Sequence, residues 1–193
     1  MQIKEIGMKC SILAIFVALS ACQLAPSSYK KSYVHYLETE SKASVEKLLS
    51  SNENARDLKR NAKAILVFAN ILKVGFGHGV LLNPNERTIG YYHIHAASTE
   101  HPLSGDQGLG IALFFMDDDS LSHLEKNHGL EPGVGPSVVV IDTNFDKVVS
   151  PTTPQKGVYG FIFDRKGALF AREHIKVRKI TRVHPRGCGL ICL

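Results

Sequence analysis

Short apolar runs separated by turn-forming residues fill the sequence from Ala64 onward, and they constrain the fold more than any other feature. The runs have the length of β-strands, and Gly, Pro, Asn or Asp stands between them. None reaches the ~18 apolar residues that a membrane-spanning helix needs. The expected strands are 65–68, 72–79, 80–82, 91–97, 109–115, 137–141, 158–163 and 168–171.

The segment before these runs has a helical pattern. From Lys31 to Lys63 there is no Gly or Pro, and apolar residues recur with a period close to that of a helix. Asn52 or Asn54 interrupts the pattern and can cap a second helix. A further helix is expected to begin in the acidic run 117–119 and to end at Gly129. This layout predicts an α+β fold, in which N-terminal helices pack on an antiparallel sheet or a partly closed barrel with one inserted helix.

The beginning of the chain has the features of a bacterial lipoprotein signal. Lys4 and Lys9 precede the short apolar run 10–19, and small residues follow it. The sequence Leu19-Ser20-Ala21-Cys22 resembles a lipobox, in which the cysteine is acylated and becomes the mature N-terminus. An ordinary signal peptide with a chance cysteine is the alternative.

This signal predicts how the rest of the chain is organised. We expect a signal peptide over residues 1–21, a tether over 22–30, one domain over 31–184 and a cysteine-containing tail over 185–193. Acyl chains on Cys22 would hold the protein at a membrane. Gln23 follows the lipidated cysteine, which by the sorting rule of enteric lipoproteins resembles an outer-membrane destination facing the periplasm.

The tail carries two cysteines, Cys188 and Cys192, with three residues between them. An exported protein meets an oxidising compartment, where such a pair can form a disulfide. A zinc site would need two further ligands, and only His184 is close in sequence. We interpret the pair as a structural or incidental disulfide.

Several segments resemble, in order, the SYLF domain family. They are 64–79 (AILVFANILKVGFGHG), 90–92 (GYY), 105–110 (GDQGLG), 114–121 (FFMDDDSL), 133–137 (GVGPS) and 157–167 (GVYGFIFDRKG). The resemblance covers roughly residues 40–184, and it departs from the family pattern at Asn70 and in the histidine-rich stretch 92–101. SYLF domains occur in eukaryotic cortical-actin and endosomal proteins and in bacterial lipoproteins. The resemblance implies binding of phosphoinositides or other anionic phospholipids through basic and amphipathic surfaces.

A first group of basic residues is a candidate site for anionic headgroups. Its members, which share one face of the expected second helix, are Arg56, Lys59, Arg60 and Lys63. Near an anionic membrane surface each would contribute ~1 kcal/mol of binding free energy. The alternative is a solvated helix face whose partners are Glu53 and Asp57.

A second group of basic residues lies near the end of the domain. Its members are Arg172, Lys176 and Arg178, followed by Lys179, Arg182 and Arg186. Lys176 and Arg178 alternate with apolar residues, as on one face of a strand, and Lys179 breaks the alternation at a bulge or a strand end. The group is interpreted either as a phosphate-binding patch or as an edge strand protected by its charges.

The sequence gives little support to metal binding or catalysis. His93 and His95 share a strand face, and with His78 or His101 they could ligate a transition metal. No acidic or cysteine residue lies within four positions of His93 or His95, so exposed or core-satisfied histidines are the preferred interpretation. The chain contains no Gly-x-Ser-x-Gly and no His-Glu-x-x-His motif. We therefore predict no metal, no cofactor and no enzymatic activity; an enzyme, such as a metal-dependent hydrolase that uses the histidines, is the alternative.

Together these features predict an outer-membrane lipoprotein whose partner is an anionic phospholipid membrane surface. A structural module that binds another envelope protein, through the sheet edge or a glycine-rich face, is the alternative. The net charge of +5 would also suit nucleic acid. Export removes nucleic acid as a partner, and a periplasmic protein would meet no actin.

Overall fold

The computed structural model describes residues 27–71, 75–98, 109–141, 156–169 and 175–184. The chain divides into two units, residues 1–33 and residues 34–193. Only the opening of one helix represents the first unit among the described residues. The predicted signal peptide and the residues Cys22, Arg172, Cys188 and Cys192 lie outside the described part of the chain.

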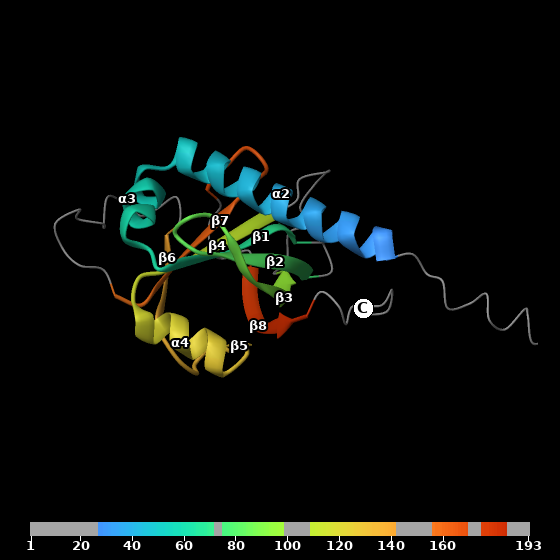
Figure 1. The fold of residues 1–193 in the computed structure, drawn as a ribbon. Helices are drawn as coiled ribbons and strands as arrows, with labels where there is room; N and C mark the ends of the chain where they lie inside the picture. Colours follow the sequence, from blue (N-terminus) through green and yellow to red (C-terminus); the bar gives the residue numbers. More distant parts are fainter. Residues whose placement is uncertain (1–26, 72–74, 99–108, 142–155, 170–174, 185–193) are drawn as a thin grey trace, which may run out of the picture. The chain divides into compact units, whose positions relative to one another are not determined.

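Helices precede and interrupt a sheet, as the sequence predicts (Figure 1). The helices are α2 (Ser27–Ser51), α3 (Glu53–Asn61) and α4 (Asp118–Lys126). The strands are β1 (Ala64–Ile71), β2 (Phe76–Leu82), β3 (Thr88–Ser98), β4 (Leu109–Phe115), β5 (Gly129–Leu130), β6 (Val138–Ile141), β7 (Val158–Phe163) and β8 (Ile175–Val183). This arrangement confirms the α+β class. Helix α2 begins inside the segment expected to be a tether.

The strands form one sheet in the order β5-β8-β3-β2-β1-β4-β7-β6. Neighbours run antiparallel except at one end, where β6 pairs in parallel with β7. A parallel pair needs a long crossover connection, and the segment 142–157 between these two strands is long enough for one. The expectation of an antiparallel sheet is therefore correct for every pair of neighbours except this one.

Apolar residues are buried on both faces of the sheet, because each face has its own cover. Val45 and Leu48 of α2 and Leu58 of α3 pack on one face. On the other face, Leu124 of α4 packs against strand residues that include Leu130 of β5. Figure 1 shows α3 on one side of the sheet and α4 on the other. The central strands β1 and β4 therefore have continuous apolar sequences rather than alternating ones.

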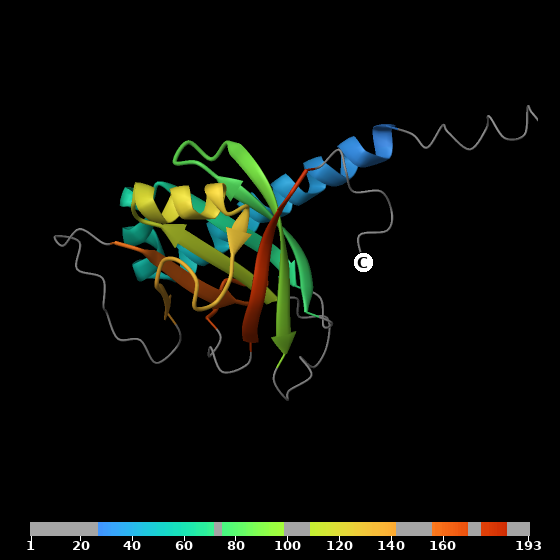
Figure 2. The same ribbon diagram turned by 90° about the horizontal axis from the view of Figure 1, so that it is seen from below.

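The sheet curls into a half-barrel. Strands β8 and β6 lie near opposite ends of the strand order, yet Val177 of β8 and Val138 of β6 line the same cavity. The concave face is the one that carries α4, and Figure 2 looks toward it. Close packing within the sheet depends on Gly79, where a Cβ would lie 2.5 Å from the Phe68 ring. The partly closed barrel predicted from the sequence is confirmed.

Side-chain caps fix the starts of α3 and α4. The Oδ1 atom of Asn52 accepts a hydrogen bond from the Ala55 amide at 2.9 Å, as the capping prediction required. Asp117 accepts from the Ser120 amide at 2.7 Å and also from the amide of Gly157, next to β7. Helix α4 ends before the expected Gly129, which begins β5 instead.

Candidate functional site

The first group of basic residues does not lie on a single helix. Arg56, Lys59 and Arg60 belong to α3, but the helix ends at Asn61 and Lys63 follows it. The Lys63 amide donates to the Phe115 carbonyl at 2.8 Å, because the chain has already turned toward β1. The predicted four-residue stripe is therefore wrong at its last position.

Most of the positive charge in this group is paired within the protein. Lys59 forms an ion pair with Glu86, Arg60 with Asp57 at 3.2 Å, and Lys63 with Asp118 at 3.3 Å. The Arg56 guanidinium donates to the carbonyls of Leu49 at 2.7 Å and Ser50 at 3.2 Å, at the C-terminus of α2. Three cations thus have carboxylate partners, and the fourth stabilises a helix end. Less charge is left for a headgroup than the sequence suggested.

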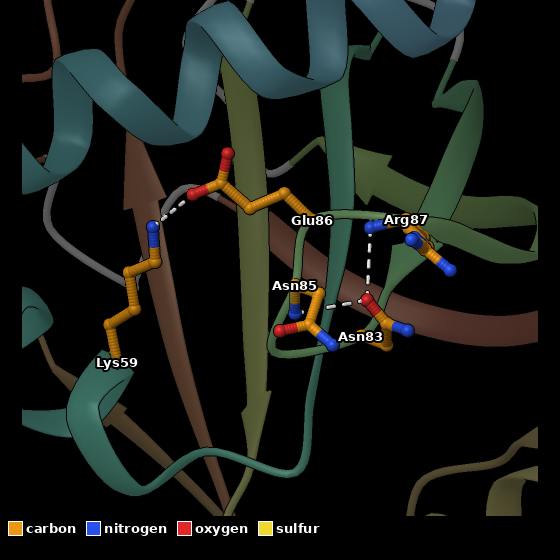
Figure 3. Close-up of polar contacts among 5 residues, drawn as sticks. All are labelled: Lys59, Asn83, Asn85, Glu86 and Arg87. Atoms are coloured by element: carbon orange, nitrogen blue, oxygen red, sulfur yellow. Dashed lines mark hydrogen bonds and ion pairs between the residues drawn. The ribbon is translucent and has the colours of Figure 1, made fainter.

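Figure 3 shows how one of these pairs ties α3 to the turn between β2 and β3. Within the turn, the Asn83 side-chain oxygen accepts from the amides of Asn85 at 3.0 Å and Arg87 at 2.9 Å. Glu86 has a φ of 58°, in the left-handed region that few side chains adopt. Its hydrogen bond with Lys59 and the Lys59 charge lower the pKa of Glu86. We assign this corner a structural role.

The members of the second group of basic residues that the structure describes lie on β8. The backbone of Lys176 is described but its side chain is not, and Arg178 is exposed. Lys179 pairs with His95 while Val177 pairs with the next residue of β3, so Arg178 is the extra residue of a bulge. The predicted break in the alternation is therefore confirmed as a bulge. Beyond β8 in the strand order only the two-residue strand β5 follows, so β8 is close to an edge, as the edge-strand interpretation expected.

The histidines gather on one face of β2 and β3. The ring centroids of His78 and His93 are 5.0 Å apart, and those of His93 and His95 are 4.7 Å apart. Phe76 stacks on His93. Burial lowers the pKa of His78 and of His93, and the neighbouring imidazoles add to the effect at His93. In the described part of the chain, no group of three His, Cys, Asp or Glu residues is arranged to hold a metal ion. His101 lies outside that part.

Sequence reasoning missed a cavity of about 670 Å³ on the concave face of the sheet. Its walls come from β4, β7 and β6 on one side and from β8 and β5 on the other. The apolar lining residues include Ile111, Leu113, Leu130, Val138, Val140, Ile162, Val177 and Ile180. Cavities of this size and apolar character are typical of small-molecule sites. Of the described residues that line it, Glu131 alone carries a charge.

The segment between β5 and β6 also lines the cavity and contributes exposed apolar side chains. Val134 of this segment is 61% exposed, and Val138, the first residue of β6, is 44% exposed. The segment rests against α4, since a Cβ at Gly135 would lie 2.3 Å from the His123 ring. Glu131, at the start of the segment, forms an ion pair with Lys179 of β8.

Comparison with known proteins does not assign this site. No family model matches the sequence, and no curated protein is significantly similar to it. The resemblance to the SYLF domain stays a prediction from the motifs. None of the helices among the described residues is both long and apolar enough to cross a membrane.

Proposed function

We propose that this protein is an envelope lipoprotein, anchored through an acylated Cys22, whose domain binds lipid by holding an apolar chain in the concave cavity. The observation that carries the proposal is the cavity itself, because its walls offer mainly apolar atoms to a ligand. Each CH₂ group buried there would contribute about 0.8 kcal/mol. Exposed Val134 and Val138 at the cavity would favour contact with the apolar part of a membrane.

The basic residues take a smaller part in this proposal than the sequence suggested. An anionic phospholipid surface remains the proposed location of the domain, since the chain from Cys22 onward carries a formal net charge of +4. Arg56 and Arg60 are exposed and would add weak, salt-sensitive attraction. The ion pairs of Lys59 and Lys63 reduce what those two residues can add. Affinity is therefore expected to depend mainly on the length of the apolar chain.

The alternating residues of β6 provide a sharp test. Val138 lines the cavity, whereas its neighbour Val139, 36% exposed, does not. Val138→Trp should fill part of the cavity and weaken binding of a fluorescent fatty acid by at least about tenfold, since several buried CH₂ groups are lost. Val139→Trp is the matched control and should change the affinity less than about twofold. Full-length protein carrying Cys22→Ser, which cannot be acylated, is suitable for these titrations.

A series of fatty acids of increasing chain length gives a second measurement. Affinity should rise about fourfold per added CH₂ until the cavity is full, and then level off. Affinity that does not depend on chain length, or equal weakening by the two tryptophan variants, would contradict the proposal.

One observation favours a second candidate, a module that binds an envelope protein. β6 is the last strand in the sheet order, and its exposed Val138 and Val139 would suit an added strand from a partner. Val139→Trp distinguishes the two candidates, because it should impair strand addition and leave fatty-acid binding intact.

A further inference from the structure

The strand register turns the charges of Lys179 and Glu131 away from the cavity. Ile180 pairs with Leu130, and both belong to the apolar core of the concave face. Successive side chains of a strand point to opposite faces, so Lys179, which pairs with His95, points away from that core. The Lys179 ammonium forms an ion pair with the Glu131 carboxylate. The charge of Glu131 is therefore drawn to the same face, although the residue is part of the lining.

The side chains that face the cavity from the sheet are aliphatic. They include Ile111 and Leu113 of β4, Ile162 of β7 and Val177 of β8. Ser137 contributes the one hydroxyl among the described residues of the lining. An ion that leaves water for such a wall loses its hydration and gains no partner of opposite charge, whereas a neutral chain loses little. The wall therefore disfavours ions of either sign.

The cavity is large enough to enclose a single-chain lipid together with its polar end. Its volume is about 670 Å³. A CH₂ group is similar in size to a water molecule, which takes roughly 30 Å³ in the liquid, so a chain of about twelve carbons would fill about half of the cavity. The polar end of such a ligand could enter with its chain, and its charge would then affect the affinity.

We propose that the cavity selects an uncharged single-chain lipid, such as a long-chain alcohol, over chains that end in an ion. This inference rests on the proposed function and narrows its ligand to a chemical class. A fatty acid would still bind through its chain. Its carboxylate would stay in water outside the cavity, however, and would keep the nearest CH₂ groups from being buried.

The test compares three probes that share a twelve-carbon chain and differ at the polar end: dodecanol, dodecanoate and dodecylamine. Each displaces a fluorescent fatty acid from the full-length Cys22→Ser protein at neutral pH and low salt, below its own micelle concentration. Dodecanol should bind about tenfold more tightly than either ion, since each CH₂ group kept out of the cavity weakens binding about fourfold. Tighter binding of dodecanoate or dodecylamine than of dodecanol would overturn the inference.

Substitutions then test whether the missing charge is the cause. Val138 lines the cavity and is exposed, so Val138→Lys should be tolerated and should raise the affinity for dodecanoate relative to dodecanol by about fivefold. Val139→Lys is the matched control, because Val139 does not line the cavity, and it should leave this ratio unchanged. Lys179→Gln should also leave the ratio unchanged, because the Lys179 ammonium faces away from the cavity.

The outcomes separate this inference from the proposed function. If the three probes bind equally and Val138→Trp weakens all of them, the cavity holds a chain but does not reject ions, and the inference fails alone. A loss of dodecanoate affinity in Lys179→Gln, or an unchanged ratio in Val138→Lys, would likewise overturn it. If none of the probes binds, or Val138→Trp leaves every affinity unchanged, the proposed function fails as well.

Discussion

Two neighbouring tyrosines on β3 should respond in opposite directions to the same substitution. The Tyr92 side chain is 0% exposed, and its hydroxyl has no hydrogen-bond partner among the residues that the structure describes. The Tyr91 hydroxyl, on the other face of the strand, donates to the Glu38 carboxylate of α2. Changing either residue to Phe removes one hydroxyl oxygen and little else, so the pair isolates the effect of the hydrogen bond.

The expected magnitudes follow from these environments. A hydroxyl that is buried without a partner destabilises the folded state by about 1–3 kcal/mol, so its removal should be stabilising. The small void that it leaves is destabilising and offsets part of this stabilisation. Tyr92→Phe should therefore raise the free energy of unfolding by about 1 kcal/mol, and the Tm by about 2–4 °C for a chain of this size. Tyr91→Phe should lower the free energy of unfolding by about 1 kcal/mol, because a hydrogen bond to a partly exposed carboxylate is lost.

The assay is urea denaturation followed by circular dichroism, with the two variants and the unmodified protein measured together. Equal m-values would show that the denatured states are comparable. If Tyr92→Phe is destabilised by 1 kcal/mol or more, its hydroxyl has a partner and the reasoning is refuted. Arg182 would then be the first partner to consider, because its charge acts on the pKa of Tyr92.

Four further predictions concern pH, backbone strain, anchoring and vesicle binding. Burial holds the folded pKa of His93 below its unfolded value, so the stability present above about pH 6.5 should be lost as the pH falls through the folded pKa. His93→Gln should flatten that loss in thermal unfolding scans. The Glu86→Gly variant should resist urea better than the Glu86→Gln variant, with a free energy of unfolding higher by about 1 kcal/mol. Both variants lose the ion pair with Lys59, but only glycine adopts the positive φ without strain. Metabolic labelling with an alkyne analogue of palmitate should mark the protein and fail with Cys22→Ser. The unacylated protein should sediment more with anionic than with zwitterionic vesicles at low salt, and equal sedimentation would remove the anionic surface from the proposal.

The sequence predicts the elements of the core well, because their signals are local. Leu109–Phe115 and Val158–Phe163 are found with the predicted bounds, since each is a continuous apolar run closed by turn residues. The cap by Asn52 is also local, because a side chain three residues before an amide can satisfy it. The end of α3 was predicted too late in the chain. Lys63 continues the helical spacing of Arg56, Lys59 and Arg60, but the backbone is already extended at Ala62.

The site could not be predicted, because it depends on contacts between distant parts of the chain. The pairing of Lys59 with Glu86 crosses 27 positions, and no local pattern indicates it. The cavity depends on the curl of the sheet, which lets Val177 of β8 and Val138 of β6 line one space. An apolar strand residue that faces a cavity has the same sequence signature as one that faces a packed core. The valines on either side of Val139 therefore could not be told from core residues.

The double role of Asp117 has a consequence for how the domain opens. One carboxylate holds the first turn of α4 through Ser120 and the start of β7 through Gly157. The hydrogen bond from Gly157 lowers the pKa of Asp117, so both hydrogen bonds should persist to a lower pH than an ordinary aspartate would allow. Amide protons at these two places, far apart in the sequence, should exchange with solvent as one cooperative unit.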